Sequence, residues 1–107
     1  MNNFEYAVDE TTLLIFNDTK HTITVKTPVT QTTNHLRHAT LSKKVLPRID
    51  LTYITVHFFE GTTLLIELHD DEARKFEEIM ADTIQRANRY YGEPAPIWRI
   101  GVKVDNF

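Results

Sequence analysis

Alternating apolar and polar residues mark several strands in the first two thirds of the chain. Ile23 and Val25 alternate with threonine and lysine across residues 22–27, which places one row of side chains in a core and the other in solvent. Stretches 4–8 and 12–16 have a similar character. Threonine suits the half-exposed face of a strand, and it is concentrated before residue 64. The chain is therefore expected to begin with a β region.

The clearest hairpin lies within residues 54–68, where two apolar rows flank a Glu-Gly turn. A two-residue loop would place the two rows on different faces of the sheet. A three-residue loop over 60–62 places both on one face, with Phe58 opposite Leu64. A slip of one residue turns every side chain over, so burial favours the three-residue loop. We predict that loop and that register.

Residues 70–91 have the three- and four-residue apolar spacing of an amphipathic helix. Acidic residues at its start and Gly92 followed by Pro94 at its end suit helix termini. The apolar stripe comprises Ala73, Phe76, Met80, Ile84, Ala87 and Tyr91. The outward positions form an acidic ridge of Glu72, Glu77, Glu78 and Asp82.

These elements predict a single α+β domain over residues 1–107. We expect an antiparallel, curled sheet of five to seven strands with the 70–91 helix packed on one face. Alternation resumes at 98–104 and predicts a final strand. Residues 28–48 have no clear period, and we expect a loop there, with a further strand at 36–41. A run of strands followed by a long helix is similar in outline to pleckstrin-homology-like domains, which usually end on their helix, whereas this chain continues.

Composition excludes several classes of site. Cysteine is absent, which excludes disulfides, cysteine-ligated zinc, iron–sulfur clusters and thiol catalysis. The three glycines are far apart, so no phosphate-binding loop is present. No apolar run is long enough to span a membrane, and residues 1–5 do not resemble a signal peptide. We expect a cytoplasmic protein with no membrane partner and no cofactor.

Charge is segregated along the chain. Residues 19–49 contain no acidic residue, so this stretch is positive in a protein of net charge −3. Arg37, Lys43, Lys44 and Arg48 lie there and are candidate contacts for an anion or a nucleic acid. The alternative interpretation is a solvated loop that balances the acidic helix.

Histidines supply the other candidate chemistry. His35 and His38 have H-x-x-H spacing, and His69 precedes two aspartates, a donor set that suits zinc, manganese or iron. The alternative is two surface histidines and an acidic helix start. Ser42 is the only serine, and it has no glycine-flanked setting of a catalytic nucleophile.

A single helix covers only one face of the predicted sheet, so the other face is exposed and we expect the chain to self-associate. His57 and the outward aromatic Phe59 are candidate interface residues, because an exposed aromatic on a bare sheet face favours a partner.

Three functions remain open at this point. The first is a non-enzymatic binding or regulatory module that acts through protein–protein contacts and forms a homo-oligomer. The second is a nucleic-acid-binding protein that uses the basic 20–48 segment, which requires its basic residues on one continuous face. The third is a small metal-dependent hydrolase, which requires His35, His38 and His69 to converge.

Overall fold

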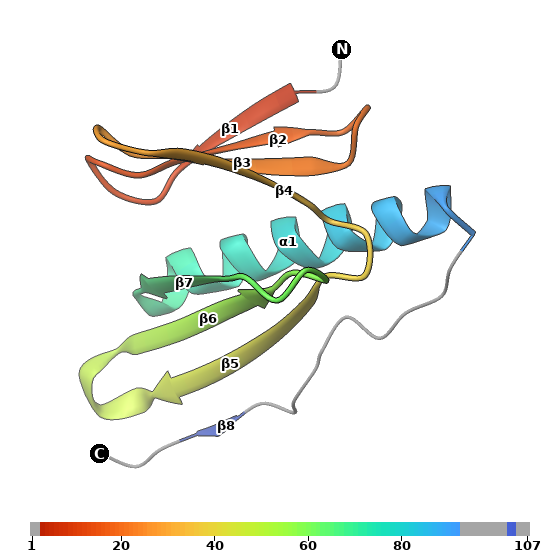
Figure 1. Cartoon of the computed structure of the whole chain (residues 1–107). Coiled ribbons are helices and arrows are strands. Elements are labelled where there is room, and N and C mark those ends of the chain that lie inside the picture. Colours follow the sequence, from red (N-terminus) through yellow and green to blue (C-terminus); the bar gives the residue numbers. More distant parts are fainter. Residues whose placement is uncertain (1–2, 93–102, 105–107) are drawn as a thin grey trace.

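The computed structural model describes residues 3–92 and 103–104, which form two β-sheets and one long helix (Figure 1). The elements are β1 Asn3–Ala7, β2 Leu13–Asn17, β3 Thr22–Lys26, β4 Gln31–His35, β5 Thr40–Leu46, the 3-10 turn η1 Pro47–Ile49, β6 Leu51–His57, β7 Thr63–Leu68, α1 Asp70–Tyr90 and β8 Lys103–Val104. The first sheet has the order β1-β2-β3-β4, and the second has the order β7-β6-β5-β8. The α+β class is confirmed.

The prediction of a single sheet was wrong, because the chain turns sharply between β4 and β5. The Leu36 N–H donates to the His21 carbonyl at 2.9 Å, and the Ala39 N–H donates to the Leu36 carbonyl at 3.1 Å. His38 has a left-handed backbone, with φ of 63°. Leu36 and Ala39 are fully buried, so the turn is anchored in the core. The chain therefore leaves the first sheet here, and β5 pairs with β6 in the second.

Residues 28–48 are consequently more regular than expected. They contain β4, the turn at 36–39 and β5 rather than a loop with a strand at 36–41. The strand β4 is entirely polar in sequence, so hydrophobic period could not reveal it.

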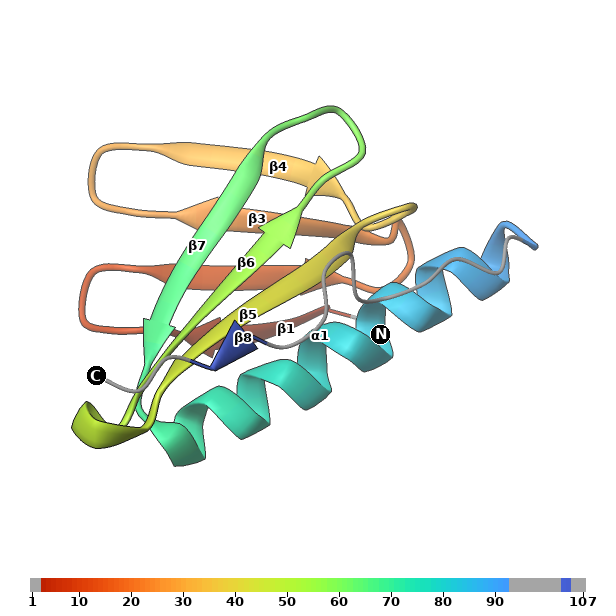
Figure 2. The same ribbon diagram turned by 90° about the horizontal axis from the view of Figure 1, so that it is seen from below.

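The helix α1 matches the predicted helix closely, but its position differs from the expectation. Instead of covering one face of a single sheet, it runs along the side of the two sheets where β1 and β5 lie (Figures 1 and 2). The core shared by the two sheets and the helix includes Leu14, Phe16 and Ile23 from the first sheet, Leu41, Ile54, Val56 and Ile66 from the second, and Phe76, Met80 and Ile84 from the helix. One apolar stripe therefore stabilises both sheets.

Two residues of the predicted acidic ridge contact the sheets. The Tyr6 hydroxyl of β1 donates to a Glu72 carboxylate oxygen at 3.1 Å, and the Lys43 ammonium of β5 lies 2.6 Å from a Glu77 oxygen. Burial, with the adjacent Glu72 carboxylate, raises the pKa of Tyr6 to about 12. The ridge therefore helps to attach the helix to both sheets.

The β6–β7 hairpin places its two apolar rows on one face of the sheet, as predicted, but its register is shifted by two residues. Ile54 pairs with Ile66 and Val56 with Leu64, so the apolar rows share one face as expected. The three-residue loop covers 59–61 instead of 60–62. Gly61 has φ of 100° and donates its N–H to the Phe58 carbonyl at 3.0 Å. A three-residue hairpin needs a positive φ at its last loop position, and glycine adopts it most easily, so Gly61 selects the register.

The predicted final strand at 98–104 is not confirmed. Residues 98–102 lie outside the described residues. The two-residue β8 pairs with β5 in parallel, and the second sheet is otherwise the antiparallel set β5, β6 and β7.

Candidate functional site

A cleft of about 490 Å³ lies at the carboxyl end of α1. Its walls come from the end of β4, the β4–β5 turn, the β6–β7 turn and the residue that follows the helix. The lining residues are His35, Arg37, His38, Phe58, Phe59, Glu60 and Tyr91. These residues come from three separate stretches of the chain, 35–38, 58–60 and residue 91, which meet only in the fold.

Aromatic and cationic side chains form the cleft surface. The Arg37 guanidinium lies 4.4 Å from the centre of the Tyr91 ring, in the geometry of a cation–π contact. The ring of His35 stands edge-on to Tyr91, with centroids 6.5 Å apart. The ring of His38 lies 5.1 Å from that of Phe59. Phe59 is 74% exposed, so a large apolar ring is presented to solvent at the cleft.

Three tertiary hydrogen bonds hold the cleft walls together. The His38 N–H donates to the Asn88 amide oxygen of α1 at 2.9 Å. The Thr62 hydroxyl, just after the β6–β7 turn, donates to the Asn34 amide oxygen of β4 at 3.1 Å. The Leu36 bond to the His21 carbonyl ties the β4–β5 turn to β3. The cleft is therefore a built feature of the fold.

Residues next to the cleft have features that cost folding free energy, namely strained backbone conformations and polar atoms with no described partner. His21 and His38 both have positive φ, at 56° and 63°, which is uncommon for residues other than glycine. His21 and Asn88 are 7% and 3% exposed, yet among the described residues His21 Nδ1 and Asn88 Nδ2 have no hydrogen-bond partner. Buried polar atoms are nearly always paired. Strain and unpaired polar atoms gather at functional sites more often than elsewhere.

Aromatic rings surround the buried His21. Its ring lies 4.6 Å from the Tyr90 ring and 6.0 Å from the Tyr91 ring. The two tyrosines contact each other edge to face at 5.0 Å, and Tyr90 is 70% exposed. The aromatic surface therefore extends from the cleft onto the last turn of α1.

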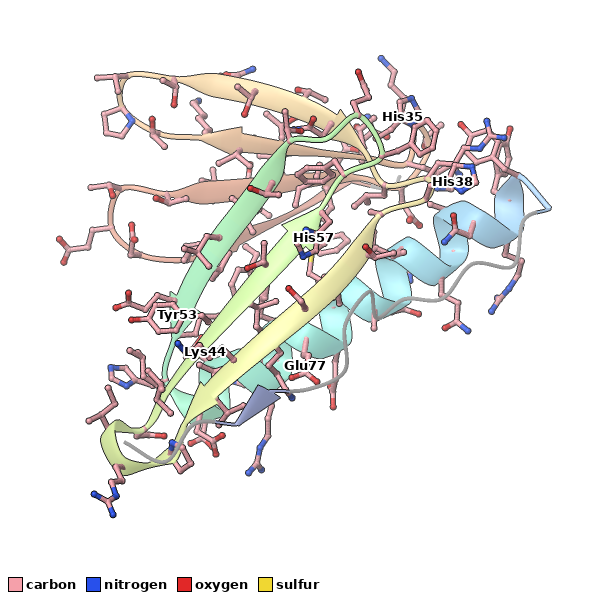
Figure 3. The ribbon with its side chains drawn as sticks, turned by 60° about the horizontal axis from the view of Figure 1, so that its bottom comes forward. His35, His38, Lys44, Tyr53, His57 and Glu77 are labelled. Carbon is pink, nitrogen blue, oxygen red and sulfur yellow. The ribbon has the colours of Figure 1, made fainter. Side chains whose placement is uncertain are left out.

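The four basic candidates do not share one face. Arg37 lines the cleft, whereas Lys43 is engaged with Glu77 between β5 and the helix. Lys44 is adjacent to Lys43 on a strand and thus projects to the opposite face of β5. Figure 3 shows Lys44 beside Tyr53, well away from His35 and His38. Arg48 is exposed in η1, beyond the end of β5.

The three candidate metal-binding histidines do not converge. His35 and His38 line the cleft, but His69 precedes the first residue of α1 and bonds through Nδ1 with the Asp50 carbonyl oxygen at 2.9 Å. A helix of 21 residues separates its two ends by about 30 Å. Within residues 3–92 and 103–104, no group of three His, Cys, Asp or Glu side chains is placed to hold a metal ion. The three histidines of the hydrolase hypothesis are therefore divided between the two ends of α1.

The two candidate interface residues lie in different places. Phe59 is in the β6–β7 turn at the cleft, not on the sheet face. His57 is on the face of the second sheet that points away from the core (Figure 3), where its Nε2 lies 2.8 Å from the Ser42 hydroxyl oxygen. Sequence reasoning missed this pair, because Ser42 and His57 lie diagonally across the β5–β6 ladder. Tyr91, which the sequence places in the apolar stripe of the helix, lines the cleft, and nothing local in the sequence reveals its contact with Arg37.

Comparison with protein-family models, with curated proteins and with solved structures found no match.

The described part of the chain, residues 3–92 and 103–104, contains no helix long and apolar enough to cross a bilayer.

Proposed function

We propose that this chain is a non-enzymatic binding or regulatory module of the cytoplasm that acts through protein–protein contacts, with the cleft at the end of α1 as its contact surface. One observation carries the proposal. The fold brings the Arg37–Tyr91 stack, His35 and His38 together around Phe59, which is 74% exposed.

The composition of the cleft favours a polypeptide partner. Tyrosine and arginine are enriched among the residues that dominate protein–protein binding energy, and aromatic residues are enriched at interfaces generally. Phe59 offers apolar area that a partner would cover, and the Tyr91 ring holds Arg37 in a defined orientation. The cleft therefore resembles the centre of an interface more than an ordinary solvated surface.

Charge indicates what the partner presents. Arg37 and two histidines line the cleft against one carboxylate, Glu60. The partner segment accordingly presents an acidic side chain to Arg37 and an apolar side chain to Phe59.

The nucleic-acid alternative has less support. It required Arg37, Lys43, Lys44 and Arg48 on one continuous face, and the structure distributes them over the cleft, the helix side of β5, its opposite side and η1. One stacked arginine with nearby aromatics does not supply the row of phosphate contacts that nucleic-acid affinity depends on.

Selection from a random peptide library on the purified full chain tests the proposal. Fluorescence anisotropy of labelled selected peptides then gives their affinities for wild type and variants. Phe59→Ala and Arg37→Glu should each weaken binding about tenfold or more, as hot-spot truncations do. Arg37→Lys keeps the charge but loses the planar stack, and should weaken binding less than Arg37→Glu.

Two matched controls separate the cleft from general effects. Val29→Ala removes an apolar side chain that is 88% exposed, and Arg48→Glu reverses an exposed charge from the same basic segment. Both should bind as wild type does. The proposal fails if selected peptides bind the cleft variants as tightly as wild type, or if no peptide is enriched. It also fails if labelled single-stranded DNA or RNA binds and Arg37→Glu abolishes that binding.

A further inference from the structure

The strand β7 forms an open edge of the second sheet. Its sheet order is β7-β6-β5-β8, and Figure 2 shows β7 at the border of that sheet. Within residues 3–92 and 103–104, one side of β7 pairs with β6 and the other pairs with no strand.

The pairing with β6 determines which main-chain groups point outward from this edge. The Phe58 N–H donates to the Thr62 carbonyl at 2.9 Å, so this is a closely hydrogen-bonded pair. Such pairs alternate along an antiparallel ladder, and Val56–Leu64, Ile54–Ile66 and Thr52–Leu68 follow. The remaining β7 residues, Thr63, Leu65 and Glu67, therefore direct both their N–H and C=O groups away from the sheet.

This edge lacks the features that normally prevent strand pairing between proteins. Natural edges carry proline, lysine, bulges or covering loops. Residues Thr63–Leu68 contain no proline, lysine, arginine or glycine, and their pairing with β6 is continuous. Leu65 is 61% exposed at the centre of the strand. The edge strand β4 of the first sheet differs, because it has no apolar side chain.

We propose that β7 pairs with β7 of a second copy of this chain, antiparallel about a two-fold axis at Leu65. In this register Leu65 faces the partner's Leu65, and Thr63 faces the partner's Glu67. All of these residues direct their main-chain groups outward, so every pair exchanges both backbone hydrogen bonds. The second sheets of the two copies become one continuous antiparallel sheet.

A second copy of this chain is the favoured partner because the outward-facing residues of β7 are complementary to themselves when two β7 strands pair antiparallel. Symmetric pairing centred on Glu67 would place two carboxylates directly opposite, which is unfavourable. Pairing centred on Thr63 would place Leu65 against Gly61 of the turn, outside the strand. Pairing centred on Leu65 avoids both and buries two exposed leucine side chains against each other. This surface is separate from the cleft, and the proposal is independent of the proposed function.

Sedimentation velocity over a range of concentrations, combined with amide hydrogen exchange, tests the pairing. Wild type should show a concentration-dependent species with the mass of two chains. The amides of Thr63, Leu65 and Glu67 should become protected as that species forms. Exchange of these three amides at the rate of an open strand at every concentration would overturn the proposal, whatever the mass.

Two variants and a control locate the interface. Leu65→Glu places two carboxylates across the axis and should weaken self-association about tenfold or more. Leu65→Pro removes an N–H that points out of the sheet, a position at which an edge strand tolerates proline, and should also weaken it. Val29→Glu makes the same apolar-to-acidic change at an exposed turn and should leave self-association unchanged. Equal association of all three variants, each with wild-type circular dichroism, would place the interface elsewhere.

Discussion

The two ends of α1 are built differently. At the amino end, polar groups pair with one another. Asp70 N–H donates to an Asp50 carboxylate oxygen at 3.3 Å, and His69 bonds with the Asp50 carbonyl oxygen. Three acidic residues in the first turn complement the helix dipole. At the carboxyl end, two buried polar atoms have no partner in the part of the chain that the structure describes, and two aromatic rings are largely exposed. The amino end serves the fold, whereas the carboxyl end presents a surface.

The two ends of α1 also differ in how they use residues with a left-handed backbone. Asp50 and His38 both have a left-handed backbone, with φ of 52° and 63°. The Asp50 side chain offsets this cost by accepting a hydrogen bond from the first residue of α1. The His38 side chain packs against exposed Phe59 and makes its contact at the cleft. Similar backbone costs therefore occur beside a helix terminus at one end and beside the cleft that we propose as the contact surface at the other.

The largest effect is expected for a core residue of α1. Phe76 is fully buried in the first half of α1 and contacts the Tyr6 ring of β1, with centroids 5.7 Å apart. Phe76→Ala should lower the free energy of unfolding by about 3–5 kcal/mol, as measured by urea denaturation. Phe59→Ala is the control, because exposed substitutions usually change stability by less than about 0.5 kcal/mol. Similar losses in the two variants would contradict the assignment of Phe59 to the surface.

The amino end should be sensitive to loss of its tertiary cap. Asp50→Gly relieves the left-handed backbone but removes the acceptor for the Asp70 N–H, and should lower the free energy of unfolding by about 1 kcal/mol. Asp50→Asn retains both an acceptor and tolerance of positive φ and should be close to wild type. A more stable Asp50→Gly variant in urea denaturation would show that the cap contributes nothing.

At the carboxyl end, the corresponding substitution to glycine should raise the free energy of unfolding instead of lowering it. His38→Gly keeps the backbone N–H that bonds to Asn88 and relieves the positive φ. It should therefore raise the free energy of unfolding by about 0.5–1 kcal/mol. The same variant loses the ring that packs on Phe59 and should bind selected peptides more weakly. Loss of stability together with unchanged peptide affinity would reverse our interpretation of this end.

The smallest effect concerns the attachment of α1 to the first sheet and appears only at alkaline pH. Burial, with the Glu72 carboxylate, raises the pKa of Tyr6 to about 12 from an unfolded value of 10.0. The resulting stabilisation is fully present below pH 10 and is lost as the pH rises towards 12. Tyr6→Phe should therefore unfold with a weaker pH dependence than wild type between pH 10 and 12, as followed by circular dichroism. Identical pH dependence in the two proteins would contradict the raised pKa.

Local signals explain what the sequence predicts well. The helix and the first three strands follow from residue periodicity, because burial of one face is decided within a few neighbouring residues. The alternation of apolar and polar residues also predicts which side chains of the β6–β7 hairpin lie on the buried face. Its register does not, because a shift by two residues keeps every side chain on the same face. Only the positive φ at Gly61 distinguishes the two registers.

Tertiary contacts explain what the sequence does not predict. The division into two sheets depends on a turn at 36–39 that is anchored by buried Leu36 and by a bond to His21 on another strand. The individual residues His35, Arg37, His38 and Phe59 were recognisable as candidates from the sequence. Their meeting with Tyr91 in one cleft was not, because it requires the fold to bring together three separate segments of the chain.

Nuclear magnetic resonance mapping of a selected peptide on the isotope-labelled full chain tests the central claim most directly. Our account predicts amide shift changes confined to the carboxyl end of α1, at residues 35–39, 58–61 and 88–91, that disappear in Phe59→Ala. Residues 47–51 and 69–72, at the amino end, should not respond. Shift changes centred on the amino end, or unaffected by Phe59→Ala, would contradict the assignment of the cleft as the binding surface.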